Sequence, residues 1–376
     1  MSTLTPLFRC SPFTSREGIL NATGRRISLA AGLIGLLGWV TPAAAQTPAA
    51  PSPITVNGVI YSQYGYQLKD TANHANSFDV TRAYVNILGK FSGGISTRVT
   101  ADIAHSAAVG ASQTFRLKYA FAAWNPSGSA LTYKMGLFTT PWIDWEEALW
   151  DYRMQGPTIL DRNGYLSSSN FGIGADGNVN HEQVDFQVGA FDNGSYSTGL
   201  GDQRKDIEGR VSVRAMNSDD MSRVGGLRIT AFGQVGKPVG GGTRSRFVGM
   251  VSYKSKTLTL AALGALTSDS TAPGSTVIVK GEVFGGYGVY HFSGSPVALI
   301  ARLDYVKPNK DAASTVAGFT QTRIIAGVSY QLTANVRLLA DLDMLSEANE
   351  STLTAGQQAA FDATRQQALF QAQFTF

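Results

Sequence analysis

The sequence is poor in cysteine, histidine, charge and long apolar runs. It has one cysteine, four histidines and only 15% charged residues, compared with roughly 25% in ordinary soluble proteins. After Val40 no apolar run reaches the roughly 18 residues that a membrane-spanning helix needs. His74, His105, His181 and His291 show neither a nucleophile-elbow setting nor His-Glu-x-x-His spacing. The sequence therefore excludes a helical membrane protein, and we predict no catalytic residue, cofactor or metal.

An export leader is predicted at the N-terminus. Arg25 and Arg26 precede an apolar run at 27–40, and three alanines ending at Ala45 follow. A basic segment, an apolar run of this length and a small-residue cleavage site together form a secretory signal peptide. The twin arginines raise the Tat route, but the flanking residues fit it poorly, and Sec export is expected. We predict residues 1–45 as the signal peptide, with cleavage near Ala45, and residues 46–53 as a short linker.

Removal of the leader changes both the charge balance and the thiol content. The leader takes four basic residues and one acid, which leaves 27 basic and 26 acidic groups and a net charge of +1. Such a small surplus gives no reason to expect a nucleic-acid partner. Cys10 leaves with the leader, so the mature chain has no thiol. This suits an oxidising compartment and excludes cysteine catalysis, thiolate metal sites and disulfides.

Segments of alternating apolar and polar residues recur along the rest of the chain. In the last of them Ala368, Phe370 and Ala372 share one face and Gln371 and Gln373 the other. In hydrocarbon every backbone group must be paired, so a membrane protein without a spanning helix must be a closed barrel. We predict an all-β fold over residues 54–376, a closed 16-stranded antiparallel transmembrane β-barrel. Its strands are expected near 54–67, 78–89, 95–106, 115–125, 131–140, 169–176, 181–192, 206–216, 225–237, 244–254, 257–268, 279–292, 297–307, 320–332, 335–346 and 367–376.

The connections between these segments alternate in length. Short ones such as 293–296 and 333–334 alternate with long ones such as 193–205 and 347–366, and 216–223 is an exception. Short periplasmic turns and long outer loops are typical of outer-membrane barrels, and an even strand count places both termini on the periplasmic side. A soluble solenoid or propeller is the alternative, but it should show a fixed repeat, and none is visible.

The two-residue period assigns the charged side chains to the lumen. For example, Leu117, Tyr119 and Phe121 are expected to face lipid, which turns Arg116 and Lys118 inward. An arginine facing lipid at mid-depth costs about 2–4 kcal/mol, whereas a wide, wet lumen of sixteen strands tolerates it. The predicted pore-lining residues are Arg82, Arg98, Asp102, Arg116, Lys118, Lys134, Arg210, Arg214, Arg228, Arg302, Asp304, Arg323, Arg337 and Asp341, and Arg246, Lys254, Asp185 and Glu282 are assigned to the same face.

Two interpretations of these inward charges stay open. Basic residues outnumber acids among them, and rings of arginine and lysine favour anions. The charges can equally be paired along the wall, where they would order water and rigidify the barrel.

The longest connection runs from Thr140 to Ser169 and contains Trp142, Trp145 and Trp150. By strand parity it is the third outer loop. Irregular backbone at membrane depth is allowed only inside a cavity, so we predict that it folds inward as a constriction, with the tryptophans anchored to the wall. An outer flap or a subunit contact is the alternative. The residues expected to set the field of the constriction are Asp144, Glu146, Glu147, Asp151, Arg153 and Arg162.

Four segments resemble the phosphate-selective porin O/P family: 79–85 (DVTRAYV), 115–121 (FRLKYAF), 133–142 (YKMGLFTTPW) and 160–162 (LDR). The likeness covers about residues 54–216. Beyond them the chain shares with the family only the alternation of apolar and polar residues in strands. The resemblance implies a 16-stranded homotrimeric channel. Phosphate-selective members carry an arginine ladder and a dense cluster of Arg and Lys at the constriction, whereas the loop of this chain is rich in acids.

The sequence therefore predicts a porin of the Gram-negative outer membrane, a water-filled channel for passive diffusion of small hydrophilic solutes with a phosphate-like anion preference. The expected partners are outer-membrane lipid and lipopolysaccharide, the solutes or anions themselves, and the barrel-assembly machinery acting through Phe376. The alternatives are an enzyme of the lipase or protease type on the same barrel, and a non-conducting adhesin or receptor with a plugged lumen.

Overall fold

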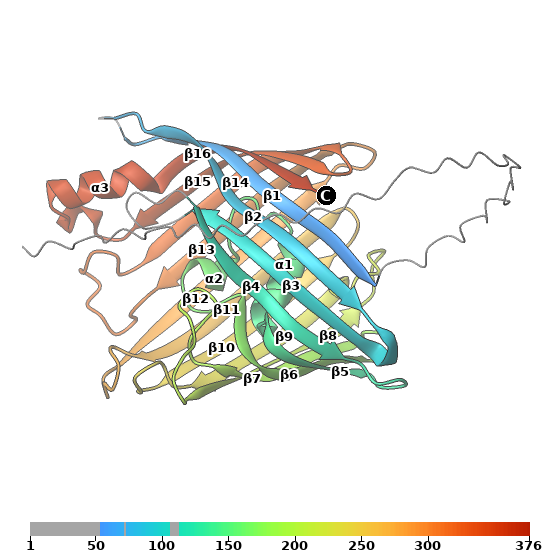
Figure 1. The fold of residues 1–376 in the computed structure, drawn as a ribbon. Coiled ribbons are helices and arrows are strands. Elements are labelled where there is room, and N and C mark those ends of the chain that lie inside the picture. Colours follow the sequence, from blue (N-terminus) through green and yellow to red (C-terminus); the bar gives the residue numbers. More distant parts are fainter. Residues whose placement is uncertain (1–52, 71–72, 106–112) are drawn as a thin grey trace, which may run out of the picture. The chain divides into compact units, whose positions relative to one another are not determined.

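The computed structural model describes residues 53–70, 73–105 and 113–376. The predicted signal peptide and all of the linker except Pro53 lie outside the described residues. The described chain forms sixteen antiparallel strands in one closed sheet, in which each strand pairs with its neighbours in sequence and β1 pairs with β16 (Figure 1). The predicted closed 16-stranded all-β barrel is confirmed.

The strand boundaries agree with the predicted ones to within three residues at every end. The strands are β1 (Ile54–Gln67), β2 (Asn76–Lys90), β3 (Ile95–His105), β4 (Gln113–Trp124), β5 (Leu131–Thr139), β6 (Ser169–Val179), β7 (Val184–Asp192), β8 (Lys205–Met216), β9 (Gly226–Gly236), β10 (Arg244–Lys254), β11 (Leu258–Ser270), β12 (Ile278–His291), β13 (Val297–Lys307), β14 (Gln321–Thr333), β15 (Val336–Glu347) and β16 (Gln366–Thr375).

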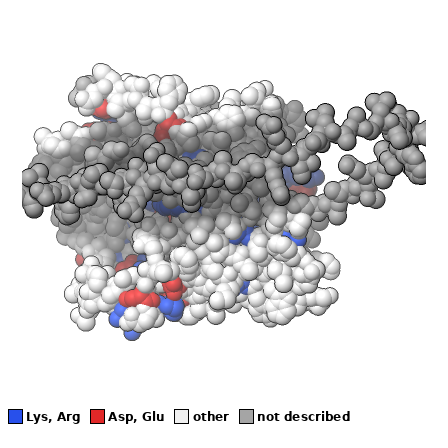
Figure 2. All heavy atoms as spheres, in the orientation of Figure 1, with Lys and Arg blue, Asp and Glu red and all other residues white. Residues whose placement is uncertain are grey.

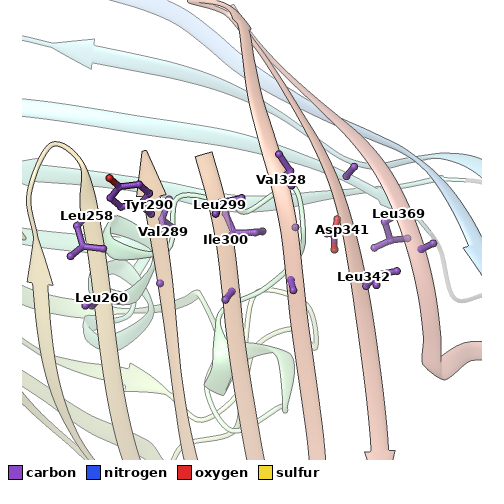
Figure 3. A pocket seen from close by; sticks show the side chains of 16 residues that line it. Leu258, Leu260, Val289, Tyr290, Leu299, Ile300, Val328, Asp341, Leu342 and Leu369 are labelled. Atoms are coloured by element: carbon purple, nitrogen blue, oxygen red, sulfur yellow. The ribbon is translucent and has the colours of Figure 1, made fainter. Parts of the chain in front are cut away.

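Alternation along each strand separates an apolar outer face from an inner face. On β13, Leu299 and Leu303 are 43% and 47% exposed, whereas Ile300 and Arg302 are each only 3% exposed. A shallow apolar groove crosses the outer wall between β11 and β16, and its lining includes Leu260, Leu299 and Leu342 (Figure 3). The visible described surface in Figure 2 is mostly uncharged, with Lys, Arg, Asp and Glu in a few small groups. Within the described ranges, no helix has the length and apolar character needed to cross a membrane.

Aromatic side chains gather on the outer face beside the short turns. Trp124 lies 5.9 Å from Tyr133 across the β4–β5 turn, and Tyr290 lies 5.1 Å from Phe292 at the end of β12, measured between ring centroids. All four are at least 40% exposed. Aromatic girdles of this kind border the apolar band of membrane barrels, so the outer surface has the chemistry of a lipid-facing wall.

The short connections contain one 3-10 turn, η1 (Ser92–Gly94), and the connection from β15 to β16 contains η2 (Glu350–Thr352) and the helix α3 (Ala355–Arg365). The helix α3 was not among the predicted elements. Thr354 and Gln357 form a capping box at its start, and this Thr-x-x-Gln spacing is the signal in the sequence that marks a helix start.

Bulges change the facing of part of the barrel. On β4 the register shifts so that Tyr119 pairs with Thr100 and Leu117 with Ala101, which leaves Lys118 as an extra residue. Lys118 and Tyr119 are therefore both buried on the inner side. The prediction that Tyr119 and Phe121 face lipid is wrong, because one extra residue reverses every facing beyond it.

The prediction that Glu282 faces the lumen is also wrong. Glu282 pairs with Leu266 and lies two residues from Phe284, and both of these apolar side chains are more than half exposed on the outer face. Residues directly opposite each other in a sheet share a face. Glu282 is near the end of β12 and forms an ion pair with Lys310 in the following loop, at 3.4 Å, so its charge lies at the rim of the barrel.

A charge scan of the outer face tests whether hydrocarbon surrounds it. Leu303→Arg places a guanidinium near the middle of β13 and should lower the free energy of unfolding from lipid by about 2–4 kcal/mol, whereas Leu332→Arg, on the same face but beside the β14–β15 turn, should cost about 0–1 kcal/mol. Denaturant unfolding in lipid vesicles measures both. Equal costs at the two positions would contradict a lipid-facing wall.

Candidate pore constriction

The loop between β5 and β6 lies inside the ring of strands. It contains α1 (Pro141–Leu149) and α2 (Ile159–Arg162), which Figure 1 shows within the barrel. Inward side chains of four strands donate hydrogen bonds to its carbonyl oxygens: Arg210 to Pro141 (3.1 Å), Lys254 to Ala148 (3.1 Å), Arg246 to Tyr165 (3.1 Å), Arg302 to Pro157 (2.6 Å) and Gln371 to Met154 (3.0 Å). The predicted inward fold of this loop is confirmed.

Apolar packing fixes the loop to one side of the lumen. Trp142, Trp145 and Trp150 are completely buried, and together with loop residues such as Ile159 they form a cluster with inward residues of β9 to β15. Trp142 packs on Phe232 and Trp150 on Tyr287, with ring centroids 5.8 and 5.2 Å apart. The inner wall is thus apolar where the loop lies against it, and the tryptophans are anchored to the wall as predicted.

Glycine on the wall makes room for this packing. At Gly285 on β12 a Cβ atom would come within 2.6 Å of Ile159 Cδ1. A larger residue there would make the end of the Ile159 side chain turn aside. The missing side chain therefore lets Ile159 pack directly against the backbone of β12.

Glu146 joins the two halves of the loop. Its Oε2 accepts a hydrogen bond from Trp142 Nε1 at 2.8 Å, and its Oε1 accepts one from the backbone N–H of Ile159 at 3.1 Å. The side chain is fully buried. Burial raises the pKa of Glu146 from its ordinary value of 4.5 to about 7, against the lowering effect of the nearby Arg302 guanidinium and of the two hydrogen bonds.

Most of the predicted pore-lining charges form ion pairs along the inner wall. Arg82 and Arg116 share the carboxylate of Asp102, at 2.7 and 3.3 Å. The other pairs are Lys134 with Asp176 (2.6 Å), Arg302 with Asp304 (2.7 Å), Arg214 with Glu182 (3.3 Å), Arg337 with Asp151 (3.2 Å), Arg323 with Asp343, and Arg210 with Asp185. Asp341 accepts only a long hydrogen bond, from Gln155 at 3.4 Å.

Two of the predicted arginines have no carboxylate within ion-pair distance among the described residues. Arg98 donates to Thr100 and Asn86 and lies 4.3 Å from the centre of the Tyr119 ring. Arg228 is fully buried, donates to the carbonyl oxygens of Gly225 and Glu182, and lies over Trp145.

Four of the six charges predicted for the constriction fasten the loop. Asp144 is paired with Arg223 at 2.6 Å, Asp151 with Arg337, and Arg162 with Asp343 at 2.9 Å; Glu146 is internal. The remaining two face strands β2 to β4. Glu147 lies 3.0 Å from Arg153 and 3.9 Å from Lys118, and Arg153 is 4.0 Å from Asp161.

Two cavities lie between the loop and the wall. The smaller, of about 150 Å³, is lined by Tyr61, Arg82, Tyr84 and Arg153 among others. The larger, of about 470 Å³, is lined by Arg82 and Arg116 from the wall, by loop residues from Asp161 to Ser167, and by polar side chains of β8 to β10. Arg82 lines both cavities, so its guanidinium marks the place where they approach each other.

We call Tyr61, Arg82, Tyr84, Lys118 and Arg153 the constriction cluster. The two tyrosines were not among the predicted site residues, although Tyr84 lies two positions from Arg82 on the same face of β2. Asp161 was also missed, because a single acid in a loop carries no periodic signal.

Side chains that could bind a metal are scattered among the described residues. None of their His, Cys, Asp and Glu side chains form a group of three or more that could hold a metal ion. The histidines lie apart: His74 and His181 have left-handed backbone in turns, His105 pairs with Asp79 at 3.4 Å, and His291 ends β12.

Comparison with solved structures shows the fold shared with bacterial outer-membrane channels. No family model and no curated protein sequence matches the chain. OmpF of Salmonella typhi superposes with a TM-score of 0.61 at 15% identity, covering 86% of this chain and 97% of OmpF. The anion-selective porin of Comamonas acidovorans gives 0.59 at 14%, and the trimer form of OmpT, an outer membrane protein of Vibrio cholerae, gives 0.59 at 14%; both cover 86% of this chain and 99% of the other. At these identities the likeness establishes the fold.

The buried Glu146 should make stability depend on pH. Between its ordinary pKa of 4.5 and its raised pKa of about 7, the folded protein holds a proton that the unfolded chain releases. The free energy of unfolding should therefore fall as pH rises through this window, by roughly 3 kcal/mol. Glu146→Gln should remove this part of the slope and cost about 1–3 kcal/mol for the N–H group left without an acceptor.

Denaturant unfolding in detergent at several pH values compares the two proteins. Glu147→Gln, a change in the neighbouring, partly exposed carboxylate, is the control and should keep the slope of the wild type. A slope unchanged in Glu146→Gln would show that this carboxyl group does not titrate in the window.

Proposed function

We propose that the protein is an outer-membrane porin, a water-filled channel for passive diffusion of small hydrophilic solutes with a preference for anions. One observation carries the proposal: the loop inside the closed barrel packs against one side and leaves two polar cavities, one beside β1 and β2 and one that reaches from β2 and β4 to β8–β10. A barrel of sixteen strands has a lumen wide enough for water, whereas a barrel of eight is filled by side chains.

The anion preference rests on an uneven charge distribution. Five cations and three acids line these two cavities: Arg82, Arg116, Arg153, Arg244 and Arg246 against Asp161, Asp206 and Glu208. On the wall that the loop covers, Arg302, Arg323 and Arg210 are paired with carboxylates, whereas Arg228 donates to carbonyl oxygens. A surplus of arginine and lysine beside an aqueous path raises the local concentration of anions.

The resemblance to the phosphate-selective porin O/P family supports a channel that takes phosphate-like anions. The constriction cluster lies next to Glu147 and Asp161, so we propose a general anion preference over strict phosphate selectivity. The Comamonas acidovorans structure, described as an anion-selective porin, has the same fold.

We further propose that the chain is exported by the Sec route with loss of residues 1–45 and is inserted in the outer membrane of a Gram-negative cell, in contact with lipid and lipopolysaccharide. A homotrimer is proposed because the family resemblance implies one and because a structure of the same fold was solved in a trimer form.

The unpaired Arg98 offers a direct test of the anion preference. Arg98→Gln removes one positive charge near the path. At a separation of roughly 8 Å and a water-like dielectric the interaction energy is about 0.5 kcal/mol, favourable for an anion and unfavourable for a cation, so the anion-to-cation permeability ratio should fall roughly fivefold. Reversal potentials under a salt gradient in planar bilayers measure this ratio.

Lys307→Gln is the matched control, because Lys307 shares the outer face of β13 with Leu303 and its charge lies outside the lumen. It should leave the reversal potential unchanged. A wild-type reversal potential on the cation side would overturn the anion preference. Folded protein that forms no conducting pore would overturn the channel itself.

A further inference from the structure

The constriction cluster combines aromatic rings with cations around a small cavity. Tyr61 and Tyr84 meet edge to face, with ring centroids 6.3 Å apart and an interplanar angle of 87°. Arg82 and Arg153 line the same cavity, as do the apolar Met154 and the ring of Pro157. Its volume is about 150 Å³. Since one water molecule occupies about 30 Å³ in the liquid, the space suits about five waters or one small organic molecule.

The cationic side chains around this cavity outnumber the acidic side chains that pair with them. Arg82 shares the single carboxylate of Asp102 with Arg116, and the Asp102 side chain is fully buried while that of Arg82 is 25% exposed. On the loop side, Lys118 and Arg153 lie beside Glu147 and Asp161. A positive charge therefore remains on the Arg82 side, where the smaller cavity meets the larger one.

Lys118 supports the ring of Tyr84 in the cluster. Its ammonium donates a hydrogen bond to the Tyr84 hydroxyl at 3.2 Å and lies 4.6 Å from the centre of that ring. The Lys118 side chain is only 4% exposed. The ammonium thus orients the tyrosine and adds positive potential behind it, while the ring covers it from solvent.

Two bulges build this arrangement. Thr81 is the extra residue of β2 beside Arg82, opposite the step from Tyr61 to Ser62, and Lys118 is the extra residue of β4. The other register shifts in the barrel, near Arg214 and Gln331, lie at strand ends beside turns. A bulge within a strand disrupts the ladder of hydrogen bonds and serves to re-aim a side chain. Both bulges within strands re-aim residues of the constriction cluster.

We propose that the constriction cluster is a subsite for organic carboxylates with an aromatic or bulky apolar body, a class of solute that it selects over inorganic anions. This inference rests on the proposed channel function. A carboxylate would bind the guanidinium of Arg82, whose planar fork suits it. The apolar body would lie against Tyr61, Tyr84 and Met154.

Inorganic phosphate fits the cavity less well. A phosphate ion needs hydrogen-bond donors around all of its oxygens, whereas two rings, a methionine and a proline contribute carbon to this wall beside the polar Gln63, Thr81 and Gln155. An apolar group gains binding affinity when it displaces poorly ordered water from such a surface. An aromatic ring gains further affinity from an edge-to-face contact with tyrosine.

Block of single-channel current tests the proposal with four probes: benzoate, acetate, inorganic phosphate and uncharged benzyl alcohol. Benzoate should block at a concentration about tenfold lower than acetate or phosphate do, which corresponds to the contribution of one aromatic pair. Benzyl alcohol should block weakly, because it lacks the charge that Arg82 binds.

Two substitutions at one position separate the ring from the hydroxyl. Tyr84→Phe and Tyr84→Leu both remove the hydroxyl, but only Tyr84→Leu removes the ring. Benzoate block should stay near the wild-type value in Tyr84→Phe and weaken about five- to tenfold in Tyr84→Leu. Arg82→Gln should weaken the block by benzoate and by acetate alike. Tyr290→Leu, on the outer face, is the matched control and should change neither.

Equal block by phosphate and benzoate, or benzoate block unaffected by Tyr84→Leu, would overturn the subsite while leaving the channel intact. Folded barrel without conductance would overturn the channel function. In that case calorimetric titration of benzoate into the detergent-solubilised barrel, with the same variants, still decides whether the subsite exists. Circular dichroism of each variant confirms that the barrel is folded.

Discussion

Pairing of every backbone group within the sheet is the constraint on which the rest of this structure depends. The barrel closes because β16 pairs with β1, and the closure extends to reciprocal backbone hydrogen bonds between Gly58 and Phe376, at 2.9 and 3.0 Å. A closed sheet has no open edge, which is what a hydrocarbon surrounding requires. Closure also forces each strand to present one face outward and one inward. The facing of each charged side chain then follows from its place in the two-residue period.

The closed ring of sixteen strands leaves an interior larger than its own side chains can fill, and the β5–β6 loop fills one side of it. That side resembles the core of a soluble protein: Trp145 and Ile143 are fully buried, and the inward Ile325 and Leu339 of the wall are buried against the same cluster. The lumen is consequently asymmetric. Its apolar side holds the loop in place, and its polar side is left for water and solutes, so the position of the loop decides where a path can run.

Much of the fold could be predicted from the sequence, because the alternation of apolar and polar residues in strands and the residues of turns are local signals. The facing of Arg302 and Asp304 followed from alternation alone. The sequence could not show the bulges. Around Lys118 and Tyr119 it keeps the polar–apolar alternation of a regular strand, and only the pairing with β3 reveals the extra residue. Nor could it show that Glu146 holds two halves of a loop together, because its partners Trp142 and Ile159 meet it only after the loop has folded. The bulge and the role of Glu146 both depend on contacts between residues that the sequence does not show to be neighbours.

The two interpretations of the inward charges, paired wall and anion-attracting lumen, differ in how far water reaches each arginine. Beside the loop, Arg302 is almost fully buried and holds Asp304 with two hydrogen bonds, as a charge removed from water must be paired to be tolerated. Among the described residues the partly exposed Arg98 has neutral acceptors, and that is tolerable because water can solvate it. Arg228 is also without a carboxylate partner in the described part of the chain but is fully buried, and it instead donates to two carbonyl oxygens and lies over Trp145. A buried inward arginine thus needs acceptors from the protein, whereas an exposed one can be solvated, and under the proposed channel function the exposed ones are those that a solute can reach.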